Sequence, residues 1–77
     1  MSRTVRIALA AALAKLPRRQ REAIALRYLS DMTEAETAAA LGIGIGSVKT
    51  HTHRGLASLR ETFGGKYDEL QMEQLGV

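Results

Sequence analysis

The chain has 77 residues, no cysteine and a formal net charge of +3. This length allows one small domain, and the missing cysteines exclude a disulfide framework and a thiolate metal site. No apolar run approaches the roughly 20 residues of a membrane-spanning helix, so no membrane partner is expected. Because a cysteine-free chain fits a reducing compartment, we expect a cytoplasmic location.

The charge is divided unevenly along the chain. Residues 1–60 contain ten basic and four acidic side chains, whereas residues 61–77 contain one basic and four acidic side chains. A basic body is typical of proteins that bind a polyanion such as nucleic acid. Ordinary surface charge, kept for solubility, is the alternative interpretation.

The first half of the chain predicts two helices. Residues 3–15 are rich in Ala and Leu, which are strong helix formers. Pro17 ends this helix and can open a second one at residues 17–29, because its missing N–H costs little in a first turn. The apolar side chains expected inside are Ile7, Leu9, Ala10, Leu13 and Leu16 from the first helix, and Ala23, Ile24, Leu26, Tyr28 and Leu29 from the second.

A capping box and a glycine mark out a short third helix at residues 34–41. Thr33 and Glu36 have the spacing at which each side chain accepts a hydrogen bond from the other residue's backbone N–H. Gly42 suits a left-handed stop at the far end. A fourth helix then starts at Ile45. This order of short helix, glycine turn and longer helix is the helix-turn-helix pattern.

The sequence therefore predicts an all-α, four-helix domain at residues 1–63, in which Gly64 and Gly65 end the fourth helix. Residues 64–77 form an acidic tail, for which either a short fifth helix or a flexible end is expected.

The fourth helix combines an apolar back with a front that can donate hydrogen bonds. Ile45, Val48, Thr52, Leu56 and Leu59 recur at spacings of three and four, which predicts a buried stripe. The other polar positions hold no acid, and all can donate to an anion or a base edge: Ser47, Lys49, Thr50, His51, His53, Arg54 and Arg60. Such a helix suits the major groove of DNA. A solvated, basic surface helix is the alternative.

Several short motifs together resemble a known family. They are Leu16-Pro17, Gln20-Arg21, Leu26-Arg27-Tyr28, Thr33-Glu34, Leu41-Gly42, Gly46-Ser47-Val48-Lys49, Arg54-Gly55-Leu56 and Leu59-Arg60. In this order and spacing they look like region 4 of bacterial sigma factors, especially the extracytoplasmic-function group, over residues 13–60. The resemblance implies a domain that reads the −35 promoter element in double-stranded DNA and docks on the flap of the RNA polymerase β subunit. An anti-sigma factor is a further candidate partner.

The resemblance also implies roles for single residues. Lys49 would hold a phosphate or a guanine edge, Thr50 and His53 would contact bases, and Arg54 would grip the DNA backbone. Ser47 and His51 flank these and could reach phosphate. Thr33 lies at the start of the third helix, where backbone N–H groups can meet a phosphate.

Three positions depart from the family's pattern. Gly44 stands where Ser often caps the recognition helix, Thr37 stands where an aliphatic residue is common, and Gly55 places a flexible residue inside a helix at a cost of about 1 kcal/mol against Ala. A whole sigma factor also has an upstream domain that melts the −10 element. The chain is therefore expected to be either an excised domain or a stand-alone relative.

Two other classes of protein share part of this pattern. The DNA-binding module of LuxR-type response regulators has the Val48-Lys49-Thr50-His51 string, and a protein-interaction module bound by an anti-sigma factor would use the apolar residues of the first two helices. No enzyme, cofactor or metal is expected. His51 and His53 point about 200° apart on a helix, whereas zinc-binding pairs on helices are four residues apart.

Overall fold

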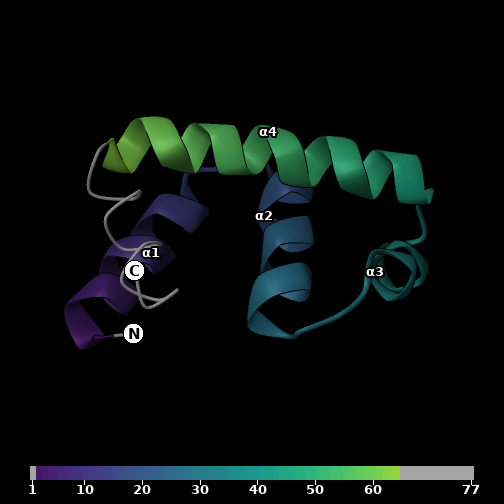
Figure 1. Ribbon diagram of the computed structural model, residues 1–77, viewed down its shortest axis with the longest axis horizontal. Helices are drawn as coiled ribbons and strands as arrows, with labels where there is room; N and C mark the ends of the chain where they lie inside the picture. Colours follow the sequence, from purple (N-terminus) through teal and green to yellow (C-terminus); the bar gives the residue numbers. More distant parts are fainter. Residues whose placement is uncertain (1, 65–77) are drawn as a thin grey trace, which may run out of the picture.

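The computed structural model describes residues 2–64, and the regular elements within this range are all helical (Figure 1). They are α1 (Arg3–Ala14), α2 (Arg18–Ile24), the π-helical continuation η1 (Ala25–Leu29), α3 (Glu34–Leu41) and α4 (Ile45–Phe63). The expected all-α fold of four helices is confirmed. The short fifth helix expected in the tail concerns residues that lie outside the described range.

The boundaries of the first two helices follow from local chemistry. The Ser2 hydroxyl accepts a hydrogen bond from the Val5 backbone N–H at 3.2 Å and so caps the start of α1. Pro17 is the residue before α2, with a φ of −53°, and the helix begins at Arg18. Pro17 therefore separates the two helices as expected.

The second helix ends in a wider turn than the sequence predicted. In η1 the Ser30 N–H donates to the Ala25 carbonyl five residues earlier, at 3.1 Å. This wider winding moves the last residues off the stripe that α-helical spacing assigns to them. Tyr28 and Leu29 are 53% and 58% exposed, so the expectation that they lie inside is wrong.

The core lies where α1, α2 and α4 meet. Its buried residues are Ala12, Leu13, Leu16, Ile24 and Leu59, with Leu9, Leu56 and Phe63 packed against them. Ile7 is 61% exposed, because it stands two residues from Leu9 and so points to the other side of α1. The apolar face of α1 is therefore narrower than expected.

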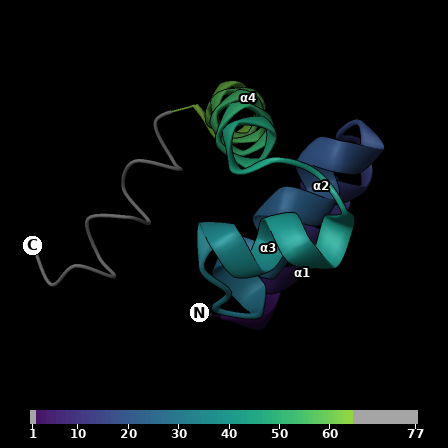
Figure 2. The ribbon, with the colours of Figure 1, turned by 90° about the vertical axis from the view of Figure 1, so that its right-hand side faces the viewer.

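Helix α4 lies across the other three helices, as two perpendicular views show (Figures 1 and 2). It packs mainly against α2 and α3, with a smaller contact to α1. One side of α4 is thereby held against the fold and the opposite side faces solvent. Among residues 2–64, no helix is long and apolar enough to cross a membrane.

Candidate nucleic-acid interface

The turn between α3 and α4 is closed by backbone hydrogen bonds around one left-handed glycine. Gly42 has a φ of +68°. The Gly42 N–H donates to the Ala39 carbonyl at 3.4 Å, and the Ile43 N–H donates to the Ala38 carbonyl at 3.1 Å. This pair of bonds is the Schellman motif. It ends α3 and redirects the chain within three residues, so that α4 begins at Ile45.

The start of α3 contains the capping box that the sequence predicted. The Glu36 N–H donates to Thr33 Oγ1 at 3.0 Å, and the Thr33 N–H donates to Glu36 Oε1 at 2.8 Å. The backbone and side-chain hydrogen bonds from Thr33 lower the pKa of Glu36 below its ordinary value. The Thr33 N–H is thus already engaged, and the Thr33 hydroxyl would have to turn from the Glu36 carboxylate to donate to a phosphate.

The two faces of α4 are clearly separated by burial. Val48 is fully buried, Gly55 is buried and Leu59 is 2% exposed, while Thr52 and Leu56 are half-buried. Ile45 was expected in the same stripe, but it is the first residue of α4 and is 46% exposed, so the buried stripe starts one turn later.

The polar side chains of α4 form a band of unequal exposure. Ser47, Lys49, Thr50, His53 and Arg54 are all exposed, whereas His51 is half-buried. At 100° per residue, Thr50, His53 and Arg54 lie on the side opposite Val48 and Leu59, and His51 lies on the flank next to the buried stripe. Within the part of the chain that the structure describes, no group of three or more His, Cys, Asp or Glu residues could hold a metal ion.

Gly55 is the point of closest approach between α2 and α4. A Cβ atom placed on Gly55 would lie 2.4 Å from Ile24 Cδ1 and 3.4 Å from Gln20 Cβ. No real Cβ contact is as short as the first of these distances, so the buried Ile24 side chain would have to shift. The glycine that the sequence marked as a source of flexibility is therefore a packing residue, since it lets α2 lie directly against the backbone of α4.

Arg19 is a residue of this region that the sequence did not single out. Its guanidinium group donates to the Leu41 carbonyl at 3.4 Å and forms an ion pair with Glu22 at 3.6 Å, and Arg18 pairs with the same carboxylate at 3.3 Å. The bond to Leu41 ties α2 to the end of α3. The spacing of three and four residues to Glu22 could have indicated the ion pairs, but nothing local indicates the contact with Leu41.

Comparison with known proteins places this fold in a family. The sequence matches the family described as sigma-70, region 4, over residues 6–59. The chain belongs to the sigma-70 region 4 family. Region 4 is the non-enzymatic part of a sigma factor that binds the −35 promoter element in transcription initiation. The match favours region 4 over the LuxR-type module that the sequence left open.

Two groups of curated relatives are similar to this region 4 domain. It is 48% identical over 50 residues to an RNA polymerase sigma-E factor from Streptomyces antibioticus, covering 65% of this chain and 28% of that protein. The sigma-E factor of Streptomyces coelicolor is 51% identical over 43 residues, which is 56% of this chain and 24% of the relative.

An extracytoplasmic-function sigma factor of Bacillus subtilis, SigW, is 40% identical over 47 residues, covering 61% of this chain and 25% of its own length. The chain therefore spans about a quarter of the length of the curated relatives it matches. No solved structure gives a significant match.

Proposed function

We propose that this region 4 domain reads the −35 element of double-stranded promoter DNA with the exposed side of α4 in the major groove. The observation that carries the proposal is the exposed band of hydrogen-bond donors between Ser47 and Arg54, which contains no acid and lies opposite the buried Val48 and Leu59. The major groove of B-DNA, about 12 Å wide, admits an α-helix. The short α3 and its closed turn hold α4 in position without covering this band.

The exposure of the side chains along α4 supports the contacts that we propose for each of them. Thr50 and His53 lie near the centre of the exposed side and are proposed to contact base edges. Lys49 and Arg54 are proposed to hold phosphates, and Lys49 can also reach a guanine edge. Ser47 and the half-buried His51 are proposed as flanking phosphate contacts.

Thr33 is proposed as a further phosphate contact, from the start of α3. Its backbone N–H is engaged by Glu36, so in this proposal the donor is its hydroxyl, turned away from the Glu36 carboxylate. The lowered pKa of Glu36 keeps a negative charge beside this position, which opposes a phosphate there. Thr33 is accordingly the weakest of the proposed contacts.

We further propose RNA polymerase, through the flap of its β subunit, as the protein partner, and an anti-sigma factor as a competing one. The exposed apolar side chains of Ile7, Tyr28 and Leu29 support a protein contact. They belong to α1 and η1, whereas the band that is proposed to face DNA belongs to α4. Because RNA polymerase acts in the cytoplasm, we propose a cytoplasmic location as well.

Base reading can be tested by selecting preferred DNA sites with the native chain and with Thr50→Ala and His53→Ala. Each variant should lose discrimination at one or two base positions, by about 1–3 kcal/mol for each good base contact. Thr62→Ala is the matched control, because Thr62 is exposed on the last turn of the same helix, where its hydroxyl donates to the Ser58 carbonyl at 3.0 Å. If Thr50→Ala and His53→Ala both selected the same DNA sites as the native chain, base reading by this band would be refuted.

A further inference from the structure

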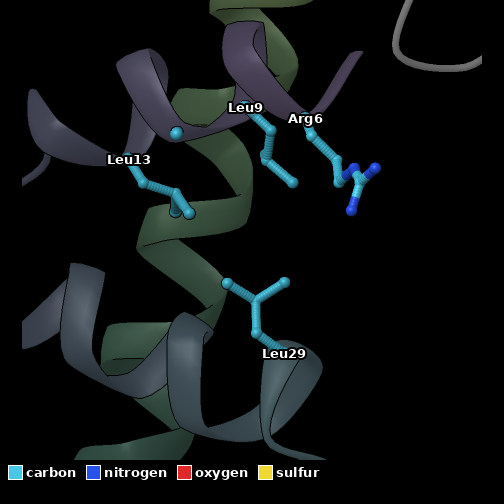
Figure 3. A pocket seen from close by; sticks show the side chains of 5 residues that line it. Arg6, Leu9, Leu13 and Leu29 are labelled. Atoms are coloured by element: carbon cyan, nitrogen blue, oxygen red, sulfur yellow. The ribbon is translucent and has the colours of Figure 1, made fainter. Parts of the chain in front are cut away.

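Ile45 is an exposed apolar residue at the start of a helix whose next exposed positions are glycine or polar. It is the first residue of α4 and is 46% exposed. The other large apolar residues that are exposed in the described range 2–64 belong to α1 and η1. One of them, Leu29, faces Leu9 and Leu13 across a hollow and so has apolar neighbours in its own domain (Figure 3). Ile45 instead lies beside the band of donors on α4.

The surroundings of Ile45 leave space for a ligand. Its neighbours Gly44 and Gly46 have no side chains, and nothing lies within 4 Å of the position that a Cβ atom would take on either of them. The backbone is held in place, because the Val48 N–H donates to the Gly44 carbonyl at 3.1 Å and so starts the helix. The beginning of α4 is therefore narrow, and Ile45 supplies the exposed apolar surface there.

Ile45 adjoins the residues that are proposed to contact DNA. Residues four apart lie on the same side of a helix, so Ile45 stands one turn before Lys49. In helix-turn-helix proteins, the first residues of the second helix contact base edges. At a rise of about 1.5 Å per residue, Ile45 precedes Thr50 by on the order of 7 Å, which is about two base-pair steps. A contact from Ile45 would therefore fall on a different base pair from the contact of Thr50.

An apolar side chain recognises a different feature of DNA from a hydrogen-bond donor. The exposed donors of α4 can pair with acceptors, namely phosphate oxygens, N7 and O6 of guanine, N7 of adenine and O4 of thymine. The C5-methyl group of thymine also faces the major groove, but it forms no hydrogen bond and is recognised by apolar contact. Contact between this methyl group and an exposed isoleucine removes apolar surface of both partners from water.

We propose that Ile45 contacts the C5-methyl group of a thymine towards one end of the recognised site and so favours a T·A pair there. This contact requires α4 to lie in the major groove, and it therefore rests on the proposed function. It adds base discrimination to the contacts of Thr50 and His53 without a further hydrogen bond. A cytosine at the same place lacks the methyl group and presents an amino donor in the groove, so it gains nothing from the isoleucine.

Replacing thymine by uracil in the DNA tests this contact, because uracil lacks only the C5-methyl group and still pairs with adenine. A site selected by the native full chain is synthesised with one thymine at a time changed to uracil, and fluorescence anisotropy measures each affinity. One substitution, about two base pairs from the position that Thr50→Ala alters, should weaken binding roughly fourfold, as expected for one buried methyl-sized group. A selected site without thymine there, or no loss with uracil, would overturn the proposal.

The same DNA pair with protein variants assigns the methyl contact to a side chain. Ile45→Ala should bind the thymine and uracil sites with equal affinity, because the apolar partner is gone. Thr62→Ala, on the last turn of α4, should keep the roughly fourfold difference. Thr50→Ser removes the methyl group of the other candidate, keeps its hydroxyl and should also keep the difference. A difference that persists in Ile45→Ala, or that disappears in Thr50→Ser, would show that another side chain makes the contact.

Two checks separate this contact from folding and from base reading in general. The far-ultraviolet circular dichroism of Ile45→Ala should match that of the native chain, since 46% exposure makes the substitution compatible with folding. If Thr50→Ala and His53→Ala change the selected sites while uracil has no effect, base reading by α4 stands and the contact of Ile45 is refuted. If the native chain selects no preferred site, both proposals are refuted.

Discussion

At Gly42 a single backbone angle determines how α3 connects to α4. Its φ of +68° lies in the left-handed region, where a side chain places Cβ too close to the following carbonyl. Nothing lies within 4 Å of a Cβ at this position. Any cost of adding a side chain therefore comes from backbone conformation and not from packing.

Gly42→Ala should accordingly lower the free energy of unfolding by about 1–2 kcal/mol, as measured by urea denaturation. Gly46→Ala is the matched control. Gly46 also has open space where a methyl group would be added, but it has a helical backbone in α4, so alanine should raise stability by up to about 1 kcal/mol. Equal effects of the two substitutions would contradict the assigned cause.

The capping box makes the stability of α3 sensitive to acid. The hydrogen bonds from Thr33 lower the pKa of Glu36 in the folded state. The unfolded chain therefore binds a proton at Glu36 more readily than the folded chain does. The stabilising contribution is fully present above the ordinary pKa of 4.5 and is lost as the pH falls through the lower, folded-state value.

Glu36→Gln should remove this contribution to the pH dependence, because a glutamine side chain still accepts the Thr33 N–H but does not titrate. Denaturation of both proteins between about pH 7 and about pH 3 measures the effect. The stability of the native chain relative to Glu36→Gln should decline as the pH falls. A constant difference over this range would show that Glu36 does not contribute through its charge.

Among the elements, the contact between α2 and α4 orients the proposed DNA-binding face. The buried Ile24 lies over the bare backbone at Gly55, where a Cβ would come within 2.4 Å of Ile24 Cδ1. The glycine costs helix propensity in α4, about 1 kcal/mol against Ala, and permits close packing of the two helices in return. A substitution in either helix, at Ile24 of α2 or at Gly55 of α4, should therefore change how closely the two helices pack.

Gly55→Ala should destabilise the fold despite the better helix propensity of alanine, because overpacking a core costs roughly 1–3 kcal/mol. Ile24→Val removes the Cδ1 atom and should lose roughly 0.5–1.5 kcal/mol by itself. The double variant should be more stable than the sum of the two losses predicts, as urea denaturation of all four proteins would show. Strict additivity would mean that the two side chains do not meet.

For the whole molecule, the separation of charge predicts a salt-dependent interaction with DNA. Lys49→Ala and Arg54→Ala should each weaken binding and reduce the slope of log K against log salt by up to about 0.9 for each phosphate that the variant no longer neutralises. Arg3→Ala removes the same charge from α1, away from the band on α4, and should leave the slope nearly unchanged. Fluorescence anisotropy over a salt series measures all three. Equal slopes in the native chain and both α4 variants would exclude these phosphate contacts.

The ends of the helices could be placed from the amino-acid sequence alone. Pro17, the Thr33–Glu36 capping box, Gly42 and Gly64 act on backbone groups within a few residues of their own position. Such signals are readable without knowledge of the fold, because caps and stops are local hydrogen bonds and local angles. The donor-rich part of α4 from Ser47 to Arg54, which contains no acid, could be read in the same way, since helical spacing alone separates its exposed side from Val48 and Leu59.

Tertiary packing was needed to establish which apolar residues are covered and how α4 is held. Leu29 stayed exposed because η1 winds more widely than an α-helix, and Gly55 became a contact point because Ile24 of another helix lies over it. Arg19 reaches a carbonyl 22 residues away. Burial and long-range hydrogen bonds depend on which element lies opposite, and that is a property of the packed chain rather than of any local pattern.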